Sequence, residues 1–391
     1  MVKNLKIKQI AILGSTGSIG KNALRVVEAL GESFEIFALS AHNNIDILAA
    51  QVKHFKPKVV CISNESKLKS LKQAIGGIDV EILSGPSGLV EISKINEIDI
   101  VLMSVVGAAG LQAILAAAQK GKRLAIANKE PLVIAGKLLI EAAKKSGSEI
   151  LPIDSEHSAI FQSMQAGNAD EVNKIILTAS GGPFRDASKK QMDEATIEQA
   201  LAHPTWQMGP KITVDSATMM NKALEVIEAH WLFGAAVEKI EVLIHPESVI
   251  HSMVEFIDGS VIAQMGRPDM CLPIQYALTY PDRVKGISEH LRLDELGRLN
   301  FHKPDFDKFR LLKIGFEVAR TGGTAAAVFN AANESAVEHF LAGRIRLGKI
   351  AELIEHCLDK HEVKTDAALE ELLEADEWSR NEVNECLKQK V

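Results

Sequence analysis

Residues 10–20 read Ile-Ala-Ile-Leu-Gly-Ser-Thr-Gly-Ser-Ile-Gly, and this stretch decides the fold of the first part of the chain. The apolar run in residues 7–13 predicts a buried strand, and residues 21–30 have the apolar spacing of a helix. Glycines in the turn between them let the backbone approach a pyrophosphate, and the helix N-terminus offers free N–H groups. The segment therefore predicts a dinucleotide-binding loop, although its G-x-x-G-x-x-G spacing is a variant that an ordinary glycine turn would also satisfy.

The end of the next predicted strand, residues 34–40, bears on the choice of cofactor. Ser40-Ala41-His42-Asn43-Asn44 stands where NAD-binding folds carry a carboxylate for the ribose, and the first acid is Asp46. Without a carboxylate to repel a 2′-phosphate, and with His42 and Asn43 able to donate to one, the sequence favours NADP. The alternative is that His42 is a solvated loop residue and Asp46 binds the ribose.

Further short apolar runs at 59–62, 100–105 and 124–127 alternate with helical patterns, which predicts an α/β fold with a doubly wound parallel sheet. Asn128-Lys129-Glu130-Pro131 follows one of these strands, at the sheet edge where ligands bind in such folds. Lys129 could bind a substrate oxygen there. It could equally be a solvated lysine paired with Glu130.

Residues 151–157, Leu-Pro-Ile-Asp-Ser-Glu-His, end an apolar run and place two carboxylates one residue apart. If the chain is extended there, Asp154 and Glu156 point the same way. Two hard oxygen donors suit Mg²⁺ or Mn²⁺, and Glu225 could supply a third carboxylate. An Asp-x-Glu pair alone is common on solvated loops.

The middle of the chain carries polar groups suited to an anionic substrate. A predicted strand at 174–178 leads into the small-residue loop 179–184, and residues 201–211 form a predicted loop between a helix at 192–201 and a strand at 212–214. Trp206 and Met208 could make that loop a lid over the substrate, or could belong to the core. A helix predicted from Asp215 to His230 would put Asn221, Lys222 and Glu225 on one face, unless they form an ordinary surface pair.

The remaining segments complete the predicted architecture. Strands at 240–244, 249–256 and 261–265, the last two joined by a hairpin turn at Asp258-Gly259, predict a mixed sheet. Residues 282–310 are charged and loop-rich, as in a connector. From Leu311 the pattern is helical with an interruption at Gly322-Gly323, and the acidic tail from 367 predicts a solvated helix.

Composition excludes several classes of protein. The chain has 391 residues, 47% of them hydrophobic and 24% charged, which predicts two or three globular domains. A net charge of −7 without a basic block argues against nucleic acid as a partner. The four cysteines form no C-x-x-C, which argues against a zinc site or disulfide framework and fits the cytoplasm. No apolar run reaches the length of a signal peptide core or a membrane span.

Taken together, these motifs closely resemble the 1-deoxy-D-xylulose 5-phosphate reductoisomerase family over nearly the whole chain. The segments that carry the resemblance are 14–20, 127–130, 152–159, 178–184, 202–209 and 215–222 with Glu225, supported by 245–252 and 329–334. Individually most of these motifs are weak, but their order and combination are specific. A semialdehyde-type dehydrogenase would need a catalytic cysteine motif, which is lacking, and a non-catalytic sensor would have no use for the acids.

The resemblance implies an enzyme of the non-mevalonate isoprenoid pathway that isomerises and reduces 1-deoxy-D-xylulose 5-phosphate to 2-C-methyl-D-erythritol 4-phosphate. It implies NADPH and Mg²⁺ or Mn²⁺ as cofactors, with Co²⁺ as a further alternative, and a cytoplasmic homodimer. The implied domains are a Rossmann-like cofactor domain (1–148), a catalytic domain with the lid and a dimerisation sheet (149–281), a connector (282–310) and a helical C-terminal domain (311–391).

The resemblance also implies roles for individual residues. Asp154, Glu156 and Glu225 are implied metal ligands and, with Lys129 and His203, the catalytic set. Implied substrate contacts are Lys129, Ser155, Glu156, Ser180, His203, Ser216, Asn221, Lys222 and Glu225. Implied cofactor contacts are Thr16, Gly17, Ser18, Ile19, Ala41, His42, Asn43, Asn128, Glu130 and Gly209. His42 departs from the family, in which many members carry a lysine near the 2′-phosphate.

Overall fold

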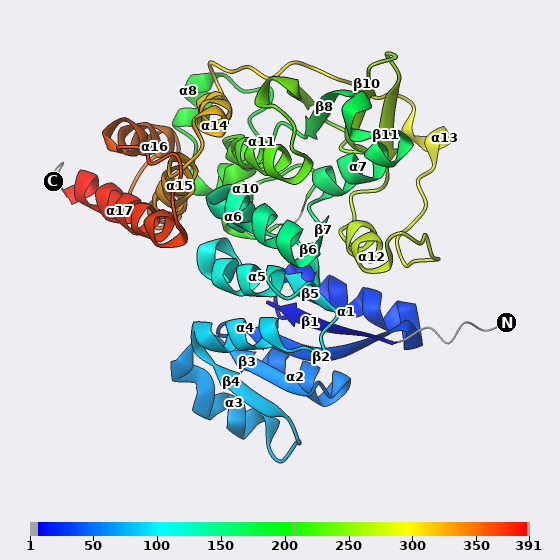
Figure 1. Ribbon diagram of the computed structural model, residues 1–391. Coiled ribbons are helices and arrows are strands. Elements are labelled where there is room, and N and C mark those ends of the chain that lie inside the picture. Colours follow the sequence, from blue (N-terminus) through cyan, green and yellow to red (C-terminus); the bar gives the residue numbers. More distant parts are fainter. Residues whose placement is uncertain (1–6, 207, 389–391) are drawn as a thin grey trace. The chain divides into compact units, whose positions relative to one another are not determined.

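The computed structural model describes residues 7–206 and 208–388, which form two compact units (Figure 1). Unit 1 comprises the chain up to Pro131, Lys137–Ser158 and Asp269–Glu289. Unit 2 comprises Leu132–Gly136, Ala159–Pro268 and the chain from His290. Three of the dividing points fall inside helices, two in α6 (Glu130–Ser146), which has a kink at Ala135, and one in α7 (Ser155–Ser163).

Unit 1 is built on a seven-stranded sheet whose neighbouring strands are all parallel, which confirms the predicted doubly wound fold. Its strands are β1 (Lys8–Leu13), β2 (Phe34–Ala41), β3 (Val59–Ile62), β4 (Glu81–Ser84), β5 (Ile100–Met103), β6 (Arg123–Ile126) and β7 (Glu149–Pro152). The order is β4-β3-β2-β1-β5-β6-β7. Sequence reasoning missed β4, because this edge strand is not fully buried and lacks the continuous apolar run of the central strands.

Helices cover both faces of this sheet. They are α1 (Ser18–Leu30), α2 (Ile45–Phe55), α3 (Leu68–Ile75), α4 (Gly85–Lys94), α5 (Leu111–Ala118) and α12 (Cys271–Thr279). Right-handed crossovers place α1 to α3 on one face and α4 and α5 on the other, and the packing of α2 on α3 and of α4 on α5 agrees. The strand order reverses between β1 and β5, which is the switch point where such sheets bind cofactors.

Unit 2 contains the predicted mixed sheet. Its strands are β8 (Val172–Ala179), β9 (Ile240–Ile244), β10 (Ile250–Phe256) and β11 (Val261–Met265), in the order β11-β10-β8-β9. Strand β8 is parallel to β9, and β10 is antiparallel to both of its neighbours. The predicted hairpin turn between β10 and β11 is confirmed, with Gly259 at φ 86°.

Two of the sequence predictions for the middle of the chain are wrong. The helix expected at 192–201 is two short helices, α8 (Lys189–Asp193) and α9 (Ile197–Leu201), because Thr196 caps a new helix with Gln199. The strand expected at 212–214 is part of helix α10 (Pro210–Ala217), which starts at a proline whose fixed φ suits the first helical position.

The helix expected from Asp215 to His230 is also wrong, because the chain breaks at Met219. Helix α10 ends at Ala217, and α11 (Met220–Phe233) begins after Met219, which has a left-handed φ of 60°. Asp215 therefore lies inside a helix instead of capping one. Its buried carboxylate accepts a hydrogen bond from Asn333 at 2.9 Å and forms an ion pair with Lys211 at 2.8 Å.

The part of the chain from α14 onward is helical, as predicted. Its helices are α14 (Arg310–Thr321), α15 (Ala325–Leu341), α16 (Lys349–Lys360) and α17 (Leu369–Lys388). A short helix, α13 (Leu293–Leu296), lies in the preceding segment, which was expected to be loop-rich. Helix α15 packs against α16 and α17, and α14 packs against α11. Gly322 and Gly323 interrupt the helices with φ angles of 64° and 55°, as expected. Helix α17 is only partly solvated, because Leu372, Ala375, Ser379 and Val383 are buried.

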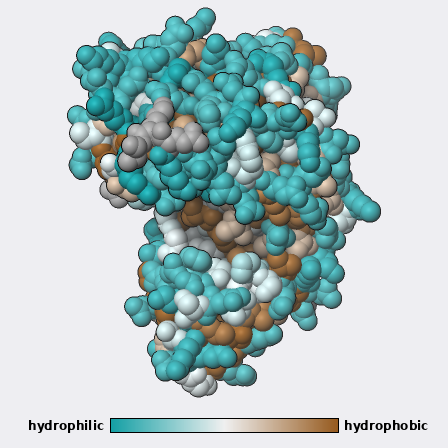
Figure 2. Space-filling view, turned by 90° about the vertical axis from the view of Figure 1, so that its left-hand side faces the viewer, coloured by the Kyte–Doolittle hydropathy of each residue, from teal (hydrophilic) through white to brown (hydrophobic). Residues whose placement is uncertain are grey.

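The surface is mainly polar where it can be seen. On the face drawn in Figure 2, hydrophilic residues cover most of the visible area. Within the described ranges, no helix combines the length and the apolar character needed to cross a membrane.

Candidate active site

Asp154 lies where strand β7 gives way to helix α7. The helix begins at Ser155, and the Asp154 carbonyl accepts a hydrogen bond from the Ser158 N–H at 2.8 Å. The expectation that residues 154–156 are extended is therefore wrong, and Asp154 and Glu156 are not alternate residues of one strand. The Glu156 carboxylate instead accepts a hydrogen bond from the Ser155 hydroxyl at 2.5 Å.

The Asp154 carboxylate is held in its charged form. Its Oδ2 lies 2.6 Å from Lys129 Nζ and 3.7 Å from Nδ1 of the buried His157. Burial alone would raise the pKa of Asp154, but the Lys129 charge and the His157 contact together hold the pKa well below its usual range. Lys129 is thus mostly buried and paired with Asp154, which overturns the reading of a solvated lysine.

Glu225 is a second buried carboxylate, on α11. Its side chain is fully buried, its Oε1 accepts from Asn221 Nδ2 and its Oε2 from Lys222 Nζ, both at 2.5 Å. Lys222 is also buried, so the alternative of an ordinary surface pair is wrong. One turn of helix brings the three polar groups together, as the i, i+3 and i, i+4 spacing predicted.

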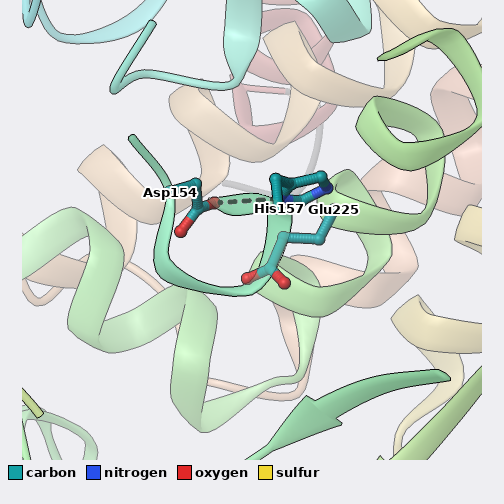
Figure 3. A group of neighbouring side chains, drawn as sticks. All are labelled: Asp154, His157 and Glu225. Atoms are coloured by element: carbon teal, nitrogen blue, oxygen red, sulfur yellow. Dashed lines mark ion pairs between the residues drawn. The ribbon is translucent and has the colours of Figure 1, made fainter. Parts of the chain in front are cut away.

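Asp154, His157 and Glu225 form the group of side chains best suited to a metal ion. One ligand atom from each residue lies within 4.8 Å of the others (Figure 3). Figure 3 shows the two carboxylates and the imidazole gathered at one point. Two carboxylate oxygens suit Mg²⁺ or Mn²⁺, and a ring nitrogen suits the transition metals among divalent ions.

Sequence reasoning missed His157 and expected Glu156 in its place. Once α7 is known to begin at Ser155, the i, i+3 spacing of Asp154 and His157 puts them on one face, so a helix-start signal at Asp154-Ser155 would have found the histidine. Glu156 does not belong to the group that Figure 3 draws. Its role as a ligand stays a prediction.

The loop after β8 brings three predicted substrate residues together. Ser180 Oγ accepts a hydrogen bond from the Gly182 N–H at 3.2 Å and lies 3.1 Å from His203 Nε2. Gly182 has a φ of 63°, and a Cβ there would lie 2.6 Å from the Ser216 carbonyl oxygen. Only glycine allows this approach, which sets the loop directly against α10 and Ser216.

The contacts of His203 fix its tautomer. Its Nδ1 accepts hydrogen bonds from the N–H groups of Thr205, at 3.1 Å, and Trp206, at 2.9 Å. Burial lowers the pKa of the ring, so the neutral form is favoured, with its proton on Nε2. Nε2 then donates to Ser180 Oγ, which leaves the Ser180 hydroxyl proton available to another acceptor.

The predicted lid lies between α9 and α10. Trp206 and Met208 are both half-buried, and Gln207 between them lies outside the described residues. The Trp206 ring lies 6.4 Å from the His251 ring, measured between centroids. Neither side chain is therefore a core residue, so the alternative that Trp206 and Met208 belong to the core is wrong.

The glycine loop after β1 has the geometry of a cofactor cradle. A Cβ on Gly14 would lie 2.5 Å from the Ser104 carbonyl oxygen, and one on Gly20 would lie 2.5 Å from Ser15 Cα. Ser15 is buried, with its hydroxyl 2.6 Å from the Gln51 side chain, so it does not face a ligand. The predicted contacts Thr16, Gly17, Ser18 and Ile19 remain at least partly exposed at the start of α1.

The other predicted cofactor residues lie at the ends of parallel strands, except Gly209. Ala41 and Glu130 are buried, and Asn128 Nδ2 donates to the Gly107 carbonyl at 3.3 Å. His42 Nδ1 lies 2.9 Å from Ser63 Oγ, and Asn43 Oδ1 accepts from Asn64 Nδ2 at 2.6 Å. Gly209 is exposed and is the N-cap residue of α10 in unit 2.

Comparisons with known families match most of the chain. A family model described as 1-deoxy-D-xylulose 5-phosphate reductoisomerase matches residues 10–136. A model of the C-terminal domain of the same enzyme matches residues 150–233, and a further C-terminal model, described as DXP reductoisomerase C-terminal domain, matches residues 265–382.

Individual relatives agree over nearly the full length. The 1-deoxy-D-xylulose 5-phosphate reductoisomerase of Pelotomaculum thermopropionicum is 48% identical over 376 residues, which cover 96% of this chain and 97% of that protein. The solved structure of the Zymomonas mobilis enzyme in complex with NADPH has a TM-score of 0.92 at 42% identity, covering 98% of this chain and 99% of that one. A DOX-P reductoisomerase structure in complex with NADPH, fosmidomycin and magnesium has a TM-score of 0.93 at 45% identity, covering 97% and 98%.

Proposed function

The chain belongs to the 1-deoxy-D-xylulose 5-phosphate reductoisomerase family, and from that premise we propose how its side chains divide the work of the reaction. It is an NADPH- and Mg²⁺-dependent enzyme that isomerises the carbon skeleton of 1-deoxy-D-xylulose 5-phosphate and reduces the product to 2-C-methyl-D-erythritol 4-phosphate. When bound, the divalent cation polarises neighbouring substrate oxygens, and NADPH supplies the hydride.

We propose that Asp154 and Glu225 hold the divalent cation. The observation that supports this most directly is the approach of their carboxylates, with His157, to within 4.8 Å. The low pKa of Asp154 keeps a negative oxygen available at any working pH, so cation binding needs no prior proton loss. Glu156, predicted from the resemblance, and His157, found in the structure, are the two candidates for the third ligand.

The two buried lysines place positive charge beside these carboxylates. Lys129 lies 2.6 Å from Asp154 and Lys222 lies 2.5 Å from Glu225. An ammonium group beside the substrate can donate to an anionic or developing negative oxygen. We assign Lys129 and Ser155, with the carboxylates, to the reacting end of the sugar.

We assign the phosphate end to unit 2. The hydroxyls of Ser180 and Ser216, the Asn221 amide and the Lys222 ammonium are all of the donor type that binds phosphate oxygens. His203 holds the Ser180 side chain through Nε2, while Thr205 and Trp206 hold the ring from behind. Phosphate binding is therefore coupled to the lid, on which Trp206 and Met208 can exclude water from the reacting carbons.

We place NADPH at the switch point of the seven-stranded sheet. Residues 16–19 at the exposed start of α1 offer N–H groups to the pyrophosphate. Ala41, His42 and Asn43 lie beside the adenosine, and Asn128, Glu130 and Gly209 lie toward the nicotinamide. The close glycine contacts of residues 14 and 20 support this placement, because a side chain at either would push the loop away.

We propose that the enzyme is a homodimer that pairs through the mixed sheet. Strand β11 lies at the sheet edge, and Ile257 in the turn before it and Val261 and Ile262 within it expose 69%, 48% and 38% of their surface. An exposed apolar edge strand tends to pair with a strand of another chain, so we expect β11 to pair with a second copy of this protein. Sedimentation of the wild type as a monomer at micromolar concentration would exclude this.

Two further assignments rest on the resemblance. We propose the division into a cofactor domain (1–148), a catalytic domain (149–281), a connector (282–310) and a helical domain (311–391). We also propose a cytoplasmic location, which the four free thiols support, because a reducing compartment keeps cysteines unpaired.

The decisive test is NADPH consumption. Purified enzyme with Mg²⁺, NADPH and 1-deoxy-D-xylulose 5-phosphate should oxidise NADPH, and metal removal should stop it. Glu225→Gln should lower kcat by at least about 100-fold, because it replaces a charged ligand, while NADPH affinity stays near wild type. Glu228→Gln is a matched control, since this residue is also buried on α11 and should keep its turnover. Equal losses in both variants would refute the assignment.

A further inference from the structure

A groove at the carboxyl end of β2 shares Asn43 with the cofactor contacts assigned above, and its other lining residues have no role assigned so far. It has a volume of about 760 Å³ and lies entirely in unit 1. One wall is the β2–α2 turn and the start of α2, and the other is the segment after β3 with helix α3. Its lining residues are Asn43, Asn44, Ile45, Asp46, Lys67, Ser70, Gln73 and Ala74.

The position of this groove is where a dinucleotide fold meets the 2′ position of the adenosine ribose. An NADP-binding site needs positive charge there to accept a phosphate, and the end of β2 carries no arginine or lysine. The His42 ring lies 2.9 Å from the Ser63 hydroxyl, and the Asn43 amide oxygen already accepts from Asn64. The β2–α2 turn thus offers no lysine or arginine, and Asp46 adds a carboxylate that would repel a phosphate.

Lys67 is the only cation that lines the groove. It ends the short helix η2 (Glu65–Lys67), its side chain is exposed, and it forms no ion pair with any described residue. Its place is set by Asn64, whose Oδ1 accepts from the Ser66 N–H at 3.1 Å and whose carbonyl accepts from the Lys67 N–H at 3.0 Å.

Asn64 also links the two walls of the groove. Its Nδ2 donates to Asn43 Oδ1 at 2.6 Å, so the turn that carries Lys67 is tied to the turn that follows β2. These hydrogen bonds fix the backbone from which the Lys67 side chain extends along the groove. Ser70 and Gln73, one and two turns further along α3, add a hydroxyl and an amide donor on the same wall.

We propose that Lys67 recognises the 2′-phosphate of NADPH and thereby determines the preference of this enzyme for NADPH over NADH. The proposal rests on the proposed function, since it concerns the same cofactor. A flexible ammonium suits a phosphate as a point charge, and it also offsets the Asp46 carboxylate in the groove. The positive charge that the β2–α2 turn lacks is in this way supplied from the following strand.

Binding measured without turnover tests this directly. Calorimetry should compare NADP⁺ with NAD⁺, and adenosine 2′,5′-bisphosphate with adenosine 5′-monophosphate, on wild type and Lys67→Ala. We expect Lys67→Ala to weaken both 2′-phosphorylated ligands about 10-fold, as for loss of one charge-assisted hydrogen bond, with the other two ligands unchanged. Lys67→Arg should restore most of the affinity, and added salt should reduce the wild-type advantage.

Lys69→Ala is the matched control, because Lys69 is exposed two residues further along the chain, in α3, but does not line the groove. It should bind all four ligands as wild type does. Equal weakening of NADP⁺ and NAD⁺ by Lys67→Ala, or no change in either, would overturn the proposal. Failure of the proposed function would look different, because the wild type would then consume no NADPH with 1-deoxy-D-xylulose 5-phosphate.

Discussion

Lys308 provides a sharp test of how the phosphate loop is held. This residue lies in the segment 282–310, which we propose as a connector, and is buried, and its Nζ donates to three carbonyl oxygens of the loop after β8. The acceptors are Phe184, Arg185 and Ala187, at 3.2, 2.7 and 3.0 Å. All three ammonium protons are thus used on the loop that carries Ser180. We predict that Lys308→Met loosens this loop.

The expected cost follows from those contacts. Methionine keeps most of the apolar stem but offers no donor, so one buried and two partly buried carbonyls lose their partner. At about 1 kcal/mol net for each bond, the variant loses about 3 kcal/mol of folding free energy. That loss corresponds to a fall in melting temperature of roughly 6–10 °C for a unit of this size. Because Ser180 is displaced, KM for the sugar phosphate should rise while KM for NADPH stays constant.

The assay combines thermal melting with steady-state kinetics. Lys303→Met is the control, since Lys303 lies in the same connector but is exposed and has no partner among the described residues. It should melt within about 1 °C of wild type, as surface substitutions usually do. A Lys308→Met variant that melts with the control, or that raises both KM values equally, would contradict this reasoning.

Three further predictions follow from other contacts. Gly182→Ala should destabilise the protein by about 1–2 kcal/mol more than Gly234→Ala in urea unfolding. Both glycines have a positive φ, but only a Cβ at residue 182 would meet a backbone oxygen. A thiol reagent at about pH 8 should label Cys386 rapidly and the other three cysteines slowly. Burial raises the pKa of Cys61 to about 12 and the pKa values of Cys271 and Cys357 to about 11, so these thiols stay protonated. Fast labelling of two or more thiols would contradict this prediction. Burial lowers the pKa of His203 in the folded protein below 6.5, so the unfolded chain binds more protons than the folded one in acid. The stability of the wild type should therefore fall as the pH drops below about 6.5. The fall should be smaller in His203→Asn, which unfolding midpoints measured at about pH 7.5 and 5.5 would reveal.

The parallel sheet could be predicted because its central strands are buried on both faces. Such strands are continuous apolar runs, and β1, β3 and β5 read that way. The edge strand β4 could not be predicted, because it begins with the charged Glu81 and its residues are only partly buried. Sequence therefore predicted the central strands of the parallel sheet better than it predicted the sheet edge.

Capping residues were a less dependable guide, as Asp154 and Asp215 illustrate. Both precede a serine and an apolar pattern. Asp154 does stand before a helix, and treating its segment as extended hid His157. Asp215 was expected to cap a helix, but it lies inside α10, where Lys211 and the distant Asn333 satisfy its carboxylate. Those partners come from tertiary packing, which no local pattern contains.

The burial of Lys222 and Glu225 was also beyond local reasoning. Their spacing predicted a shared face, yet the same spacing describes any surface pair. Helix α11 packs against α10, α14, β8 and β9, and these tertiary contacts, which local spacing does not contain, accompany the burial of both side chains. The family resemblance identified Lys222 and Glu225 as site residues, and the structure shows that both charges are buried.

Manganese binding tests the central claim most directly. Electron paramagnetic resonance of Mn²⁺ titrated into the enzyme without substrate should show one tight site in wild type, and Asp154→Asn and Glu225→Gln should each weaken it at least about 10-fold. The same titration on Glu156→Gln and His157→Gln identifies the third ligand. If Asp154→Asn and Glu225→Gln bind Mn²⁺ as tightly as wild type, these two carboxylates do not hold the cation and the account is wrong.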